Sequence, residues 1–177
     1  MAKVRLATVW LSGCSGCHMS FLDQDEKLLE LADKVELVHS PIADIKDFPE
    51  NVDITLVEGA VGNEEQLELL KKIRRRTRIL IAFGDCAVNG NVTALRNILN
   101  EGRENVLKRA YVENTMFNQG VPTQIPRLTE RVFALNEVVK VDFYIPGCPP
   151  PASLINYVLN EFLDGRIPVL DGKFKYG

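Results

Sequence analysis

The sequence predicts an α/β fold: a flavodoxin-like, doubly wound parallel sheet of about five strands with helices on both faces. Short apolar runs alternate with longer amphipathic segments, as in strands joined by crossover helices. Residues 77–83 (Thr-Arg-Ile-Leu-Ile-Ala-Phe) are almost continuously apolar, which is typical of a parallel strand buried on both faces. At 177 residues the chain has the length of one domain, so we expect a single domain over residues 1–177.

The first half of the chain supplies three of the expected strands. Residues 3–11 are rich in Val, Leu and Thr and end at a Ser-Gly turn, so they form the first strand. Apolar residues recur at helical spacing over residues 19–33, which predicts an amphipathic helix. Residues 35–39 and 52–57 form the second and third strands, with a proline-containing loop between them.

The second half begins with a well-marked helix. Asn63 is a suitable N-cap, and Gln66 stands three residues later, where a capping box places its second member. This helix leads into the fourth strand, at residues 77–83. Less regular segments follow: a short helix at 92–99, a helix near 106–113, a polar excursion at 114–126, a short helix at 132–139, a fifth strand at 141–145 and a final helix at 152–163.

Four cysteines follow the first, fourth and fifth of these strands. Cys14 and Cys17 form a C-x-x-C after the first strand, and Cys86 and Cys148 are single. Ligands of doubly wound sheets bind outside the carboxyl ends of the strands. We therefore expect the four thiols to meet at one edge of the sheet. Glu58 follows the third strand and belongs to the same edge.

Four thiolates can hold either a zinc ion or an iron–sulfur cluster. A structural zinc site usually has two local cysteine pairs, whereas this chain has one, and small residues beside the thiols leave room for close backbone approach. This spacing favours a 4Fe–4S cluster over zinc. A thioredoxin-like redox pair at Cys14 and Cys17 leaves Cys86 and Cys148 without a role. Inert buried thiols do not account for the shared placement at strand ends.

Composition excludes several classes of partner. The formal net charge is −3, so no overall basic field indicates a nucleic acid. No apolar run approaches the roughly 18–20 residues of a membrane span, and we expect no direct membrane insertion. Residues 4–10 are better explained as a strand than as part of a signal peptide. We therefore expect a cytoplasmic protein, in a compartment where free thiols persist.

Four segments of the chain resemble the small subunit of NiFe hydrogenases. They are Ser-Gly-Cys-Ser-Gly-Cys-His-Met-Ser-Phe-Leu-Asp (12–23), Val-Glu-Gly-Ala-Val (57–61), Gly-Asp-Cys-Ala (84–87) and Ile-Pro-Gly-Cys-Pro-Pro (145–150). The resemblance implies that Cys14, Cys17, Cys86 and Cys148 ligate one proximal 4Fe–4S cluster. It also implies a large-subunit partner that carries the NiFe centre and carries out H2 ⇌ 2H+ + 2e−.

Differences within that family narrow the resemblance. Exported uptake enzymes carry a signal segment and further cluster ligands, which we do not find, and the related quinone-reductase subunit has adjacent cysteines in its first motif. The chain most resembles small subunits of soluble NAD-reducing enzymes, which implies diaphorase partners that carry FMN and bind NAD. The alternative within the family is an energy-converting, membrane-associated hydrogenase. We expect no flavin here, because the cysteine pair occupies the loop after the first strand.

Other polar residues of the motifs have two explanations each. Glu58 is a candidate proton relay or partner contact, or else caps a turn or pairs with a basic residue. His18 either hydrogen-bonds near the cluster or faces a partner, or else is a solvated turn residue. Asp85 has the same functional explanation as Glu58, but it is better explained as a turn former. The basic run at residues 71–78 either docks an acidic partner or, as we favour, complements the dipole at a helix C-terminus.

Overall fold

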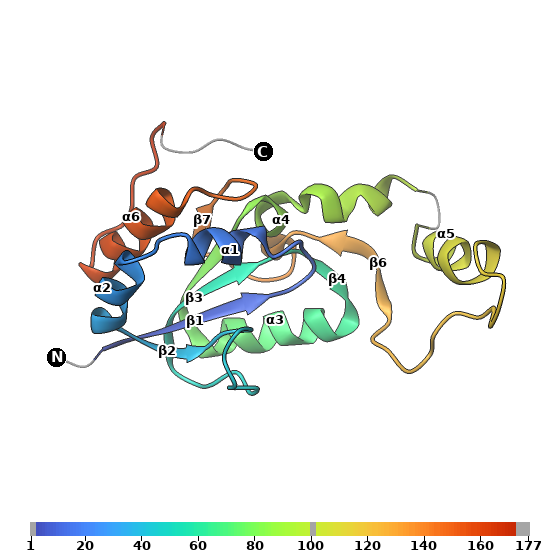
Figure 1. Ribbon diagram of the computed structural model, residues 1–177, viewed down its shortest axis with the longest axis horizontal. Coiled ribbons are helices and arrows are strands. Elements are labelled where there is room, and N and C mark those ends of the chain that lie inside the picture. The colour runs from blue at the N-terminus through green and yellow to red at the C-terminus, as the bar shows by residue number, and fades with distance from the viewer. Residues whose placement is uncertain (1–2, 100–101, 173–177) are drawn as a thin grey trace.

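The computed structural model describes residues 3–99 and 102–172. Its main sheet has five parallel strands in the order β2-β1-β3-β5-β7 (Figure 1). The strands are β1 Val4–Trp10, β2 Val35–His39, β3 Val52–Glu58, β5 Thr77–Phe83 and β7 Phe143–Ile145. The first strand lies between the second and third, which is the predicted flavodoxin-like order.

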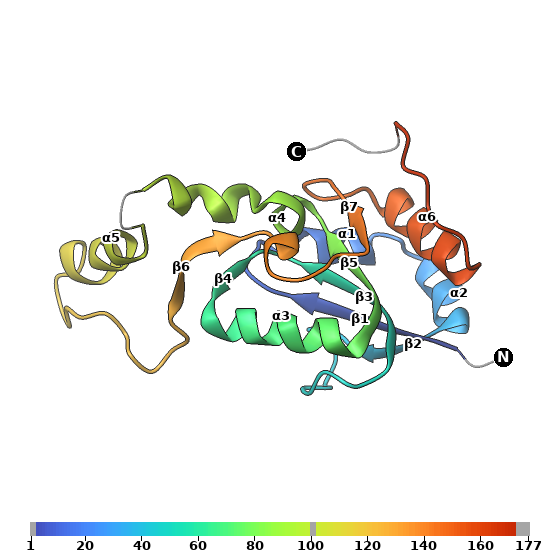
Figure 2. The same ribbon diagram turned by 180° about the vertical axis from the view of Figure 1, so that it is seen from behind.

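Helices cover both faces of this sheet, as predicted (Figures 1 and 2). One face packs against α3 and α4, which contribute buried residues to the same hydrophobic cluster. The opposite face packs against α1, α2 and α6. The helices are α1 Gly16–Leu22, α2 Lys27–Lys34, α3 Glu64–Arg76, α4 Asp85–Asn89 and α6 Ala152–Leu163.

Strand β5 shows why the fourth predicted strand is almost wholly apolar. Leu80 and Ala82 belong to the core beneath α3, while Ile81 and Phe83 belong to the core beneath α6. All four side chains are fully buried. Successive side chains of a strand point to opposite faces, so a strand covered on both faces needs apolar residues at both parities.

The strands end level with one another at their carboxyl ends. Trp10 of β1 is aligned with Glu58 of β3, Glu58 with Phe83 of β5, and Phe83 with Ile145 of β7. The segments that follow these four strands therefore leave the sheet side by side. This register brings parts of the chain as much as 130 residues apart to one edge.

Two of the predicted helices differ in the structure. The helix expected at residues 19–33 is divided into α1 and α2, with Asp25 in the left-handed region at φ 52° between them. The prediction of a helix at residues 132–139 is wrong. Strand β6 (Leu128–Phe133) pairs there with β4 (Val61–Asn63), and only the short 3-10 helix η3 (Leu135–Glu137) follows. Pairing with a distant strand overrides the local pattern at this point.

The irregular segment forms an arm that projects from the sheet (Figure 1). It contains the 3-10 helix η1 (Asn91–Ile98), α5 (Gly102–Lys108) and the π-helical turn η2 (Arg109–Glu113). Residues 114–127 have no regular structure, as the predicted excursion requires. Across the described part of the chain, no helix has the length and apolar character needed to span a membrane.

Candidate metal centre

The four cysteines lie at the carboxyl edge of the sheet. Cys14 and Cys17 follow β1, with Cys17 inside α1, while Cys86 lies in α4 directly after β5 and Cys148 follows β7. Cys17 and Cys86 are buried, and Cys14 and Cys148 are exposed. The group therefore has one side covered by protein and one side accessible from outside.

Two glycines provide space around the thiols. A Cβ atom added to Gly84 would lie 2.2 Å from Cys17 Sγ, and one added to Gly16 would lie 3.3 Å from Cys14 Sγ. Gly84 also has a φ of 83°, in a region that residues with a side chain rarely adopt. Gly84 thus gives the backbone turn after β5 its shape and leaves the space that the Cys17 sulfur occupies.

Asp85 ties the Cys86 segment to the Cys148 segment. Its carboxylate accepts a hydrogen bond of 2.7 Å from the backbone N–H of Gly147, and its own N–H donates to the Gly147 carbonyl at 3.0 Å. The residue is 2% exposed. The expected role as a local turn former is therefore incomplete, because Asp85 joins two loops that are distant in the sequence.

Glu58 anchors the C-x-x-C segment to the end of β3. Its carboxylate accepts hydrogen bonds from the backbone N–H groups of His18 (3.0 Å) and Cys17 (3.4 Å) and pairs with His18 Nδ1. The residue is 1% exposed. A carboxylate at the start of a helix also suits the positive end of the helix dipole. The contact with His18 is the pairing with a basic residue that was one of the expected explanations for Glu58.

His18 is buried, so it is not a solvated turn residue. Its ring is stacked on Trp10, with 5.6 Å between ring centroids, and lies edge-on to Phe83. Its Nε2 atom has no hydrogen-bond partner among the described residues. The histidine therefore positions the N-terminus of α1 through Glu58 and fills space beneath the exposed Trp10.

Two further polar residues hold this edge together and were not singled out from the sequence for this role. Ser20 Oγ donates a hydrogen bond of 2.5 Å to the Pro150 carbonyl, which fastens α1 to the Cys148 loop. Gln66 Oε1 accepts from Ser12 Oγ (2.8 Å) and from the Gly62 N–H (2.9 Å). Ser12 and Ser20 lie within the first motif, which was the available signal.

Burial and neighbouring thiols raise the pKa of both buried cysteines. Burial is the largest cause for Cys17, and Glu58 is the next. The pKa of Cys86 is raised to about 11, first by burial and then by Cys14 and Cys148. The two buried thiols are therefore protonated near neutral pH when no cation is bound. Binding four thiolates here requires compensating positive charge, which zinc or iron supplies.

The donor set fits an iron–sulfur cluster. Among residues 3–99 and 102–172, no group of three or more His, Cys, Asp or Glu side chains is arranged to hold one metal ion. A four-iron cluster does not require several side chains around one metal ion, because each of its cysteines binds a different iron atom. Gly84 and Gly16 leave room for the Cys17 and Cys14 sulfurs, and a group of four such thiols suits a cluster of this kind.

Comparison with known proteins agrees with this architecture. Residues 14–162, which include all four cysteines, match the family described as NADH ubiquinone oxidoreductase, 20 Kd subunit. The chain is 44% identical to the delta subunit of NAD-reducing hydrogenase HoxS from Cupriavidus necator, over 93% of the chain and 80% of that protein. It is 40% identical to one subunit of the F420-non-reducing hydrogenase vhu from Methanocaldococcus jannaschii, over 96% of the chain but only 59% of that protein.

Solved structures agree with these relatives. A chain of an H2-reduced NAD+-reducing [NiFe]-hydrogenase matches with a TM-score of 0.94 and 41% identity, over 99% of this chain and all of that one. A chain of the [NiFeSe]-hydrogenase of Dm. baculatum matches with a TM-score of 0.62 at 15% identity, over 97% of this chain and 68% of that one. The second likeness concerns the fold alone.

Proposed function

The chain belongs to the family of the NADH ubiquinone oxidoreductase 20 kDa subunit, and we propose that it is the electron-transferring small subunit of a cytoplasmic NAD-reducing NiFe hydrogenase. The observation that carries the proposal is the meeting of three cysteine-bearing motif segments, with four cysteines in all, at the carboxyl ends of the strands. The likeness to a chain of an NAD+-reducing [NiFe]-hydrogenase supports it at the scale of the whole chain.

In this proposal Cys14, Cys17, Cys86 and Cys148 hold one 4Fe–4S cluster, which when bound accepts and donates one electron at a time. The large-subunit partner carries the NiFe centre, where H2 is oxidised or protons are reduced. Diaphorase partners carry FMN and reduce NAD. This chain connects the two sites.

The residues of this chain shape the electron-transfer site in three ways. Burial of Cys17 and Cys86 excludes water from the inner side of the thiol group. Asp85 and Glu58 fix the cysteine segments relative to one another through backbone hydrogen bonds. Exposed Cys14 and Cys148 place the outer side where a partner can approach closely.

The projecting arm supports assembly with partner chains. It begins directly after α4, which carries Cys86. Along it Val92, Leu95, Met116 and Phe117 are exposed, and Met116 is 89% exposed. Exposed apolar side chains of this kind, grouped on one segment, are typical of a surface that a protein partner covers.

Anaerobic purification through a tag on this chain tests the proposal. We expect about four iron and four sulfide ions per chain, a co-purifying nickel protein, and H2-dependent reduction of NAD. Stoichiometric zinc without iron, in cells able to build clusters, would replace the proposal with a structural zinc assembly module. Co-fractionation with membrane proteins and no NAD reduction would indicate an energy-converting hydrogenase instead.

A further inference from the structure

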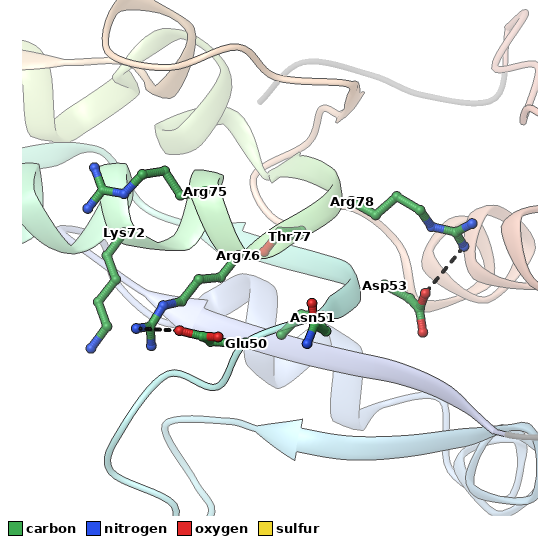
Figure 3. A pocket seen from close by; sticks show the side chains of 9 residues that line it. Glu50, Asn51, Asp53, Lys72, Arg75, Arg76, Thr77 and Arg78 are labelled. Atoms are coloured by element: carbon green, nitrogen blue, oxygen red, sulfur yellow. Dashed lines mark ion pairs between the residues drawn. The ribbon is translucent and has the colours of Figure 1, made fainter.

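A basic cavity of about 770 Å³ lies at the amino ends of β3 and β5, whereas the cysteines lie at the carboxyl ends of the strands. Figure 3 shows the side chains that line the cavity. The cavity is lined by the end of α3, the first residues of β3 and β5, and the residues just before β3. Lys72, Arg75, Arg76 and Arg78 contribute positive charge, against Glu50 and Asp53. This is a local excess of cations in a chain whose net charge is −3.

Stabilisation of the C-terminus of α3 accounts for only part of this group of cations. Arg74 already serves that purpose, because its guanidinium donates to the carbonyls of Thr77 and Arg78, which follow α3. Arg74 also pairs with Asp142 and is not among the residues that line the cavity. Arg75 and Arg76 share the last turn of α3 with Arg74, so all three complement the helix dipole, as favoured from the sequence, while Lys72 lies before this turn.

Only part of the positive charge in the cavity is neutralised within the chain. Arg76 pairs with Glu50 at 3.2 Å, and Arg78 pairs with Asp53 at 3.5 Å, as Figure 3 shows. Within the described part of the chain, no hydrogen bond or ion pair is found for the side chains of Lys72 and Arg75. The cavity thus retains two unpaired cations.

Lys72, Arg75 and Arg76 are neighbours on one side of α3, because residues three and four apart lie next to each other on a helix. Like charges in such positions repel one another. An anion bound between them relieves this repulsion. The cluster of cations therefore favours an anionic ligand over a purely structural explanation.

The lining of the cavity indicates what kind of anion it accepts. Small-molecule sites are mostly apolar and enclose most of the ligand. This cavity is open and its lining residues are mainly charged, with no aromatic side chain on which a nucleotide base could stack. We propose that it docks a carboxylate-rich segment of a protein partner, with Lys72 and Arg75 as its principal contacts. The proposal does not depend on whether the cysteine site holds a cluster.

Peptide binding to the purified full chain tests this docking site. The probe is a fluorescently labelled octaglutamate peptide, and its affinity is measured by fluorescence anisotropy at low salt. We expect the Lys72→Ser/Arg75→Ser variant to bind the peptide about ten-fold more weakly. The loss of two exposed charge contacts together lowers an affinity by about this factor. The wild-type affinity should fall as salt is added.

A control variant separates local docking from net charge. Lys71→Ser/Lys108→Ser removes the same charge, but Lys71 pairs with Glu68, Lys108 pairs with Glu113, and neither lines the cavity. We expect its affinity to stay within about two-fold of wild type, with both variants melting at the wild-type temperature. Equal weakening of the two variants, or no binding by the wild type, would overturn the proposal.

Two further measurements exclude other occupants. Inorganic pyrophosphate should compete with the peptide only weakly, and tighter binding of pyrophosphate at Lys72 and Arg75 would identify a small-anion site instead. In the complex purified with its partner chains, an acetylating reagent should modify Lys72 less than it does in the isolated chain, with Lys71 as internal reference. Equal modification of Lys72 in both preparations would contradict the proposed docking.

Discussion

The acidic side chains beside the cysteines act mainly on the backbone of the cysteine segments. Glu58 accepts from two N–H groups at the start of α1, and Asp85 accepts from Gly147. Both carboxylates are almost completely buried. Charged groups without partners are costly to bury, so these hydrogen bonds are what allow them to lie there. Each carboxylate thereby fixes the position of a cysteine segment.

At the residue scale, replacement of Glu58 separates anchoring from proton transfer. Glu58→Ala leaves the N–H groups of Cys17 and His18 without their acceptor, so we expect the free energy of unfolding to fall by about 3 kcal/mol. Glu58→Gln keeps an acceptor oxygen, so its free energy of unfolding should fall by less. Thermal unfolding of the purified chains measures both changes.

The same variants test the proton-relay alternative for Glu58. An anchoring role predicts that Glu58→Gln keeps its iron and most of its H2-dependent activity, measured per iron. Full iron content combined with lost activity would instead support a proton relay through this carboxylate, because glutamine cannot take up and release the proton.

Gly84 gives a second prediction at the residue scale. In Gly84→Ala, the new Cβ would lie 2.2 Å from Cys17 Sγ, on a backbone with φ of 83°. We expect the chain to hold less than about half the iron of wild type, because the Cys17 sulfur must move. Gly165→Ala is the control, since it also has positive φ but no atom within 4 Å of its Cβ. Equal iron in both variants would contradict this role.

At the scale of the element, the two ends of α3 are held by different means. Asn63 caps the N-terminus by accepting from the Gln66 N–H at 2.8 Å, as predicted. The side chain of Gln66 does not return to Asn63 and bonds to Ser12 and Gly62 instead. It thus joins α3 to the cysteine edge. At the other end, Arg74 joins α3 to Asp142, just before β7.

Asp142, which pairs with Arg74 at the C-terminal end of α3, makes the stability of the folded chain depend on pH. Burial raises its pKa, but hydrogen bonds from the Leu80 N–H and from Arg74 outweigh burial and hold the pKa below its usual value near 3.8. The folded state therefore gains stability from the carboxylate above the unfolded pKa. That contribution is lost as pH falls through the lower, folded pKa.

The matching experiment is thermal unfolding of wild type and Asp142→Asn across pH. We expect the variant to be less stable by about 1 kcal/mol at pH 7, a value reduced by the partial exposure of the pair. The difference in stability between wild type and Asp142→Asn should begin to narrow only below about pH 4. Asp44→Asn, in an exposed loop, should match wild type throughout. A difference that grows toward acid pH would contradict the assignment.

At the scale of the whole molecule, two sites occupy opposite edges of one sheet. The cysteine group lies at the carboxyl ends of the strands, and the basic cavity lies at the amino ends of β3 and β5. Strands of seven residues separate them by on the order of 20 Å. A partner docked at the basic edge therefore leaves the cysteine edge free for another chain.

Replacing one cysteine tests the role of the chain as the only electron path between its partners. In the assembled enzyme, Cys86→Ser should lower H2-dependent NAD reduction by at least ten-fold, since even outer partners of metal ligands affect activity by ~10–100-fold. NAD(P)H-driven dye reduction by the diaphorase should be unchanged and serves as the internal control. Full H2-dependent activity in the variant would show that electrons follow another route.

Much of the fold could be predicted because its local signals agree with its tertiary contacts. The apolar run of β5, the cap at Asn63 and the final helix are all present where expected. The pairing of β4 with β6 could not be predicted, because it joins Val61 to Phe133 and neither segment signals the other. The assignment of the four cysteines to one cluster stays a prediction, since the structure gives their placement and not what they bind.

The sequence by itself determined the alternation of strands and helices, the parallel sheet and the edge at which the cysteines lie. These follow from side-chain periodicity and from the rule that ligands gather at carboxyl ends of strands. Only the tertiary structure decided that Glu58 anchors α1, that Asp85 joins two loops and that Lys72 and Arg75 face one cavity. The physical reason is that these arrangements join residues distant in the chain, and spacing along the sequence carries no information about them.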